Sequence, residues 1–161
     1  EFAVASCNVI HDAYELSRQQ KIRVIVDAKK EADVQVNLRV CSFKEENCNQ
    51  CEKCFRTMIE IVAEGGNVND FGFHIEGSFC EALKAFLKNN VKEIDNDHLV
   101  FWKDAIARMS ENYNKLLDKD TADFLVTFDF EKEKKHGLWR YYRQNFFSIV
   151  KRKLRSIIRR G

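Results

Sequence analysis

The chain has 161 residues, 45% of them hydrophobic, which is enough to bury one moderate core. No apolar run approaches the ~18 residues of a membrane-spanning helix, and the first residues lack the order of a secretory signal peptide, so we expect a cytoplasmic protein. The formal net charge is +2, but residues 136–161 carry eight of the 27 Lys and Arg and none of the 25 Asp and Glu, which leaves residues 1–135 with a balance of −6.

The sequence contains no proline, the strongest helix breaker, and this favours helices throughout the chain. We therefore predict a mainly α protein with a minor β element. Because the sequence opens without a methionine, we also expect it to be a piece of a longer chain.

The first part of the chain mixes strand and helix patterns. Residues 2–9 are apolar and predict a short buried strand or an irregular lead-in. Residues 12–27 predict a helix capped by Asp12, although the β-branched run at its end leaves the last turn uncertain. Residues 34–43 alternate apolar and polar side chains, which predicts a strand with Cys41 near its end. Residues 52–64 predict a helix that Gly65 and Gly66 terminate.

Four of the six cysteines lie within fourteen residues, at Cys41, Cys48, Cys51 and Cys54. The last three are separated by two residues each, so that a turn leading into a helix can point their sulfurs at one centre, and Cys41 supplies a fourth ligand across a short loop. A closed set of four thiolates is typical of structural zinc, with no position left for a reactive water. We predict a zinc site here.

Two alternatives to zinc remain open at this stage. Closely spaced cysteines also hold iron–sulfur clusters, although the proline that follows the last cysteine in ferredoxins is missing. Buried or disulfide-bonded cysteines are the other alternative, which the tight spacing and the lack of secretory features disfavour.

The cysteine block and its surroundings resemble a known family. The resemblance rests on His11-Asp12, on Glu15-Leu16-Ser17-Arg18-Gln19-Gln20-Lys21-Ile22, on Leu38-Arg39-Val40-Cys41 and on Asn47-Cys48-Asn49-Gln50-Cys51-Glu52-Lys53-Cys54-Phe55-Arg56-Thr57. These segments resemble the C-terminal part of PP-loop ATP pyrophosphatase-like proteins. They are similar to cyano-deazaguanine synthases and to uncharacterised PP-loop-like proteins of bacterial surface-polysaccharide pathways. The resemblance covers about residues 6–66.

The resemblance implies an α/β nucleotide α-hydrolase-like parent, in which ATP binds to a Ser-Gly-Gly-x-Asp-Ser loop. This sequence contains neither that loop nor a Gly-Lys-Ser/Thr phosphate loop. We therefore expect ATP to act only in a longer parent, whose upstream PP-loop half would be a partner of this segment. The chain in hand is expected to be inactive alone.

Basic residues near the cysteines are weak candidates for binding a phosphate or an acidic substrate. Arg18, Lys21 and Arg56 are the cofactor-binding candidates, with Arg39 beside them, because guanidinium groups suit such anions. The alternative is that they are solvated surface charges. His11 could act as a base, but a cap or surface role is commoner for one histidine before a helix.

Beyond Gly66 only periodicity guides the prediction. Residues 78–88 predict an amphipathic helix, and residues 98–117 a longer one capped by Asp97. Residues 122–130 suit a strand or a helix. Cys7 and Cys80 stand apart from the other cysteines and are expected to be small core residues.

Residues 138–160 predict a basic amphipathic helix, with apolar side chains at helical spacing and Lys and Arg between them. It could dock on its own body or on a protein partner, lie on an anionic membrane surface, or bind nucleic acid. Docking on protein is favoured, because amphipathic helices usually bury their apolar stripe in protein.

The sequence thus predicts three parts: residues 1–73 with the zinc site, a helical region at 74–135, and the basic helix at 136–161. The predicted function is that of a zinc-stabilised C-terminal fragment of a PP-loop ATPase-like protein, whose parent activates a small substrate with ATP. The alternative is a non-enzymatic zinc-binding interaction module that its basic helix recruits to a membrane or to nucleic acid.

Overall fold

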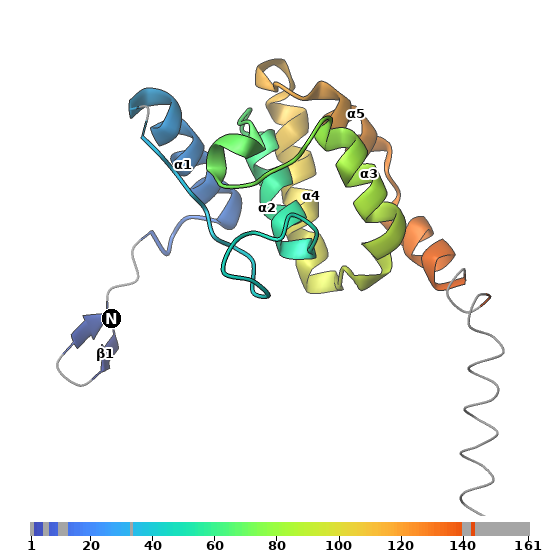
Figure 1. The fold of residues 1–161 in the computed structure, drawn as a ribbon, viewed down its shortest axis with the longest axis horizontal. Helices are drawn as coiled ribbons and strands as arrows, with labels where there is room; N and C mark the ends of the chain where they lie inside the picture. Colours follow the sequence, from blue (N-terminus) through green and yellow to red (C-terminus); the bar gives the residue numbers. More distant parts are fainter. Residues whose placement is uncertain (1, 5–6, 10–12, 33, 140–142, 144–161) are drawn as a thin grey trace, which may run out of the picture.

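The computed structural model describes residues 2–4, 7–9, 13–32, 34–139 and 143, and it is mainly helical, as predicted (Figure 1). An antiparallel hairpin, β1 (Phe2–Val4) with β2 (Cys7–Val9), is the one pair of strands in this described part of the chain. Five α-helices follow: α1 (Arg18–Ala32), α2 (Glu52–Ala63), α3 (Phe79–Asn90), α4 (Asn96–Glu111) and α5 (Lys119–Thr127). Short 3-10 helices lie between them, η1 (Val68–Phe71), η2 (Val91–Glu93) and η3 (Tyr113–Lys115), and residues 130–139 are helical.

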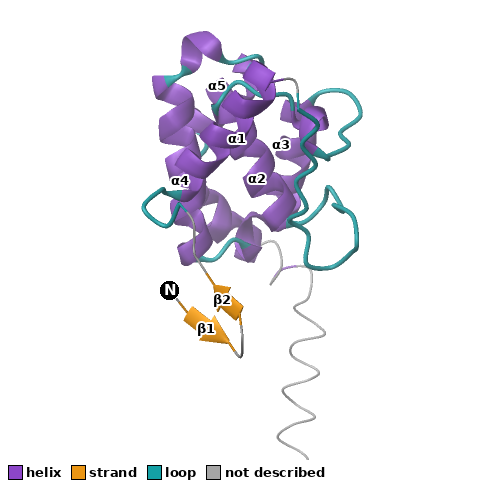
Figure 2. Cartoon of the chain, turned by 90° about the vertical axis from the view of Figure 1, so that its left-hand side faces the viewer, coloured by secondary structure: helices purple, strands orange, loops and turns teal. Residues whose placement is uncertain are grey.

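Helix α2 is the centre of the fold, and all of its residues from Cys54 to Ala63 are buried. It packs against α1 and α4, while α5 packs against both α3 and α4 (Figures 1 and 2). A helix that is apolar on most of its circumference has to be surrounded in this way. A single hydrophobic cluster contains residues from Ile22 to Phe130.

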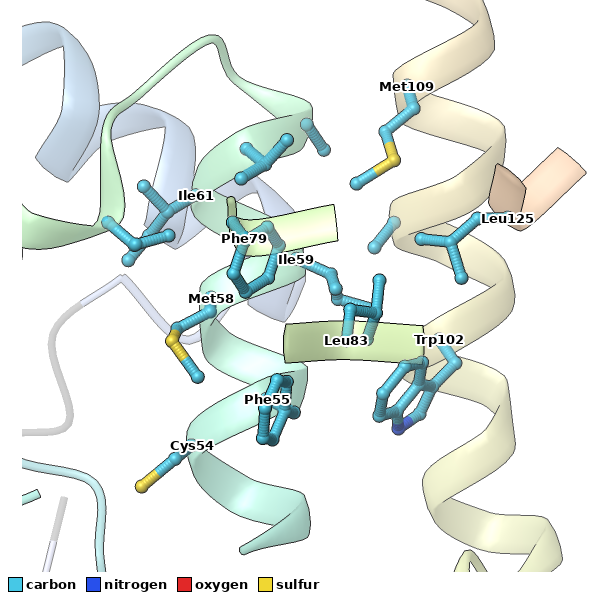
Figure 3. Close-up of a cluster of buried hydrophobic side chains, with 14 of the residues drawn as sticks. Cys54, Phe55, Met58, Ile59, Ile61, Phe79, Leu83, Trp102, Met109 and Leu125 are labelled. Carbon is cyan, nitrogen blue, oxygen red and sulfur yellow. The ribbon is translucent and has the colours of Figure 1, made fainter. Parts of the chain in front are cut away.

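A row of aromatic rings crosses the core beneath the cysteine loop. Phe79, Phe55, Phe86, Trp102 and Phe130 follow one another, with ring centroids 6.2, 4.3, 6.2 and 5.8 Å apart. Figure 3 shows three of them, Phe79, Phe55 and Trp102. Each such pair stabilises the fold by about 0.5–1.5 kcal/mol beyond the area it buries. The row therefore connects α3, α2, α4 and the helical residues that follow α5.

The first helix differs from its prediction at both ends. It begins at Arg18, where Ser17 and Gln20 form a capping box: the Ser17 hydroxyl accepts from the Gln20 backbone N–H at 3.2 Å, and the Gln20 side-chain Oε1 accepts from the Ser17 N–H at 2.7 Å. The predicted cap, Asp12, lies outside the described residues. The helix also continues to Ala32, because Val26 in the β-branched run is fully buried and tertiary packing overrides its weak propensity.

The predicted strand at residues 34–43 is wrong. Val36, Leu38 and Val40 do lie on one side and pack on the core, as the alternation predicted. Among the described residues, no strand lies beside this segment; a backbone bond from the Leu38 N–H to the Phe71 carbonyl, at 2.9 Å, joins it to η1. Side-chain groups of Asn47 take the place of a neighbouring strand.

The end of α2 follows the prediction closely. Its last turn ends at Glu64, and Gly65 adopts φ 70°, the left-handed conformation that favours glycine. The Gly65 N–H donates to Val62 O at 2.8 Å, and the Gly66 N–H donates to Ile61 O at 3.0 Å. A Cβ atom at Gly65 would lie 2.6 Å from the Lys115 carbonyl, so both the conformation and the space require glycine.

The later helices confirm two predictions and correct a third. Ser78 caps α3, and Cys80 is buried in the core. Asp95, rather than the predicted Asp97, caps α4 by accepting from the His98 N–H at 2.7 Å. The helix ends at Glu111, before the predicted residue 117, and the short helix η3 follows it.

Residues 119–127, where the sequence suited either a strand or a helix, are helical. The Cys7 side chain and most of the predicted basic helix lie outside the described residues.

In the part of the chain that the structure describes, no helix combines the length and the apolarity needed to cross a membrane.

Candidate metal centre

The structure brings together the four predicted cysteines. The sulfurs of Cys41, Cys48, Cys51 and Cys54 all lie within 4.8 Å of one another. Cys51 is the residue before α2 and Cys54 is in its first turn, so that a rigid helix fixes the direction of two of the thiols. Cys41 and Cys54 are buried and the other two are half-buried, which shields the centre on its core side.

The sulfur separations match a tetrahedral site for one ion. The Cys51 and Cys54 sulfurs are 3.5 Å apart, and the Cys48 and Cys54 sulfurs are 3.9 Å apart. Zinc–sulfur bonds of about 2.3 Å in a tetrahedron place the sulfurs about 3.8 Å apart. A disulfide would bring two of them to about 2.05 Å, and all four are free thiols. The arrangement could therefore hold a metal ion.

The loop that carries the cysteines is held by side chains from outside the set. Asn47 Oδ1 accepts from the Val40 and Cys41 N–H groups at 3.0 and 3.3 Å, and its Nδ2 donates to the Leu38 and Gly72 carbonyls at 2.6 and 2.9 Å. Satisfying four backbone groups with one amide fixes Cys41 relative to Cys48. The sequence analysis missed this role of Asn47, whose only sequence signal is its place next to Cys48.

Two further features shape the cysteine loop. Asn49 adopts φ 56°, which turns the chain between Cys48 and Cys51, and asparagine tolerates this conformation better than most residues. The Arg39 guanidinium donates to the Glu45 carbonyl at 2.5 Å and to the Lys44 carbonyl at 3.2 Å. Arg39 thus braces the loop.

The thiols experience opposing electrostatic effects. The Phe43 N–H bonds to the Cys41 sulfur and, with smaller contributions from other backbone groups, lowers the pKa of that thiol from 9.0 to about 6. Burial raises the pKa values of Cys51 and Cys54. Four thiolates gathered in this buried to half-buried site without a cation would be unfavourable, and a bound divalent cation would supply the missing positive charge. Thiolate ligands favour zinc or iron, and four of them leave no open coordination position.

Two of the three basic candidates meet at one place. Arg18 Nε donates to Glu60 Oε1 at 2.7 Å, and its NH2 donates to Thr57 Oγ1 at 2.8 Å. The guanidinium carbons of Arg18 and Arg56 lie 5.9 and 5.0 Å from the centroid of the same ring, that of Phe101. Among the described contacts to the Phe101 ring, those of Arg18 and Arg56 are present and none comes from Lys21. The structure therefore brings together two of the three predicted residues.

A row of charged residues runs along buried α2, which the sequence analysis also missed. Glu52, Arg56, Glu60 and Glu64 are spaced by four residues, so they lie on one face of the helix. Burial raises the pKa of the Glu60 carboxyl, against the opposing effect of Arg18. Four charges at this spacing inside an otherwise apolar helix are a sequence signal for buried ion pairs.

The fold and the cysteine cluster together define a class: a mainly helical protein with a four-thiol centre that could bind a metal ion. The chain matches no protein-family model, no curated protein and no solved structure.

Proposed function

We propose that the four cysteines bind one structural zinc ion in the C-terminal part of a PP-loop ATPase-like protein. The observation that carries this proposal is the separation of the sulfurs, which suits one tetrahedral ion. An iron–sulfur cluster is larger than a single ion and would need its ligand sulfurs farther apart. The zinc holds the loop of residues 41–51 to the start of α2, and this zinc has no role in bond making or breaking.

The parent protein, on this proposal, activates a small substrate with ATP in bacterial surface-polysaccharide or modified-base biosynthesis. The support is the resemblance of the cysteine block and of the Arg18 segment to the PP-loop family. Arg18 and Arg56, whose guanidinium groups both lie over the Phe101 ring, are the residues that we propose for contact with an anionic group of that substrate or nucleotide. The phosphate-binding loop belongs to an upstream part of the parent.

A second function is favoured by the concentration of charge in residues 136–161. Eight basic residues without an acidic one would suit a non-enzymatic zinc module that binds an anionic membrane or nucleic acid. The parent gene separates the two functions, since only a PP-loop enzyme encodes Ser-Gly-Gly-x-Asp-Ser upstream of this segment.

The purified chain should contain about one equivalent of zinc, because four thiolates leave no ligand position unfilled. Elemental analysis measures it, with Cys80→Ser as the control, since Cys80 is buried but lies outside the cluster. The control should retain the metal and Cys54→Ser should lose it. Less than about half an equivalent of zinc, or iron with visible absorbance, would contradict the proposal.

This chain by itself should not bind ATP tightly, because it contains no phosphate-binding loop. Calorimetry with ATP and magnesium tests this. A dissociation constant below about 10 μM, equivalent to a binding free energy of roughly 7 kcal/mol, would place a nucleotide site within these residues. It would contradict the proposal that ATP binds to the upstream part of the parent.

A further inference from the structure

A groove of about 550 Å³ lies next to the cysteine loop, between the start of α2, the end of α3 and the start of α4. Phe86, which is buried, and Phe43, which is 80% exposed, both line it. The groove is therefore apolar on the side of the aromatic row and open to solvent at the loop. It has room for a few side chains of a partner segment.

Among the charged residues that line the groove, the acidic ones outnumber the basic ones. The acidic residues are Glu52 at the start of α2, Glu93 at the end of η2 and Asp95, which caps α4. The Lys53 ammonium is engaged with Ser42 Oγ at 2.6 Å. The second basic side chain, His98, has its Nδ1 3.3 Å from Asp95 Oδ2 and 3.7 Å from Glu52 Oε2. A segment that combines apolar and cationic side chains would complement this lining.

The basic tail leaves the body at the edge of this groove. Residues 130–139 run beside η2 and the start of α4: a Cβ atom at Gly137 would lie 3.6 Å from Lys92 Cβ, and Lys134 Nζ donates to Asn96 Oδ1 at 3.4 Å. Glu93, the last residue of η2, lines the groove. The same end of the molecule is at the lower right of the helical body in Figure 1.

The tail has the composition that the groove requires. Residues 140–161 contain all eight basic residues of the C-terminal segment and no acidic residue. Their apolar side chains recur at helical spacing, at Phe146, Ile149, Val150, Leu154 and Ile157. At about 1.5 Å per helical residue, or twice that when extended, 22 residues are long enough to reach across the groove.

We propose that residues 140–161 dock in this groove of their own chain. The apolar stripe contacts Phe43 and Phe86, and the flanking basic residues pair with the exposed carboxylates of Glu93 and Asp95. Docking would cover the exposed Phe43 side chain and would place the basic tail against acidic residues. Residues 134–137 already lie beside η2 and the start of α4, next to the groove. The proposal does not depend on which metal the cysteines hold or on the activity of a parent protein.

Trypsin cleavage of the full, metal-loaded chain tests the proposal, because every basic residue of a docked tail is a protected cleavage site. Glu93→Lys should speed cleavage within residues 140–160 by roughly three- to tenfold, since an exposed ion pair and its reversal are worth about that much. Phe43→Ser should speed it through loss of the apolar contact. Asp104→Lys is the matched control, since Asp104 is an exposed acidic residue of α4 outside the groove, and it should leave the rate unchanged.

Several outcomes would overturn the proposal. Equal cleavage rates in the wild type and all three variants would show that the tail does not occupy the groove. A dimer in light scattering that Glu93→Lys dissociates would place the tail in a second copy instead. If the wild type and Glu93→Lys sediment equally with phosphatidylserine vesicles, or bind DNA equally, the tail binds those partners instead of the groove.

Both Glu93 and Phe43 are exposed, so their variants should retain the wild-type circular dichroism spectrum and melting curve.

Discussion

The variant Cys51→Ser should lower the free energy of unfolding by several kcal/mol and should leave much of the chain unfolded at room temperature. Structural zinc contributes its binding energy to folding, since the site does not exist in the unfolded chain. Cys51 directly precedes α2, against which both α1 and α4 pack. Loss of one thiolate would therefore release both the cysteine loop and the first turn of the central helix.

Guanidinium denaturation followed by circular dichroism measures this effect, with zinc content determined on the same samples. Cys80→Ser provides the control, because it makes the same chemical change at a buried cysteine that has no part in the cluster. It should cost about 1 kcal/mol, the usual range for a change at a buried polar group, and should keep its zinc. Equal denaturation midpoints for the two variants would argue against a structural metal.

The features that could be predicted from the sequence are those encoded over a short distance. The cysteines lie within fourteen residues, so their spacing alone predicts that the sulfurs meet. The central helix stops just before Gly65, whose left-handed conformation requires glycine. The alternation of apolar and polar residues at 34–40 also predicted correctly which side chains pack on the core. Periodicity does not indicate whether another strand lies alongside, so the predicted strand was wrong.

The features that the sequence analysis missed join residues far apart in the chain. Arg18 and Glu60 are 42 positions apart, and nothing near either one identifies its partner. Arg18 was predicted to contact an anionic ligand, and the anion it meets in the structure is a carboxylate of its own chain. The start of α1 was misplaced for a local reason, because the Ser17 and Gln20 capping box was overlooked in favour of an earlier aspartate.

The charged row on α2 leads to a second large expected effect, at Glu64. Its side chain is only 3% exposed, and its carboxylate accepts from Arg108 Nε at 2.9 Å, from Arg108 NH2 at 2.9 Å and from Gln19 Nε2 at 2.9 Å. Arg23 Nε lies 3.5 Å away. Because this one carboxylate joins α2 to α1 and to α4, its negative charge balances guanidinium groups from two other helices.

Glu64→Gln should lower the free energy of unfolding by about 3 kcal/mol, since removing one member of a buried ion pair leaves the other charge uncompensated. The substitution keeps the volume and one acceptor oxygen, so the loss reports the charge and not a cavity. Glu111→Gln is the matched control: Glu111 pairs with the same Arg108 at 3.3 Å, but its side chain is 68% exposed, so we expect less than about 1 kcal/mol. Urea denaturation at low and high salt compares the two, because salt screens the exposed pair more than the buried one. If Glu64→Gln proves no more destabilising than Glu111→Gln, the buried carboxylate does not hold α1, α2 and α4 together.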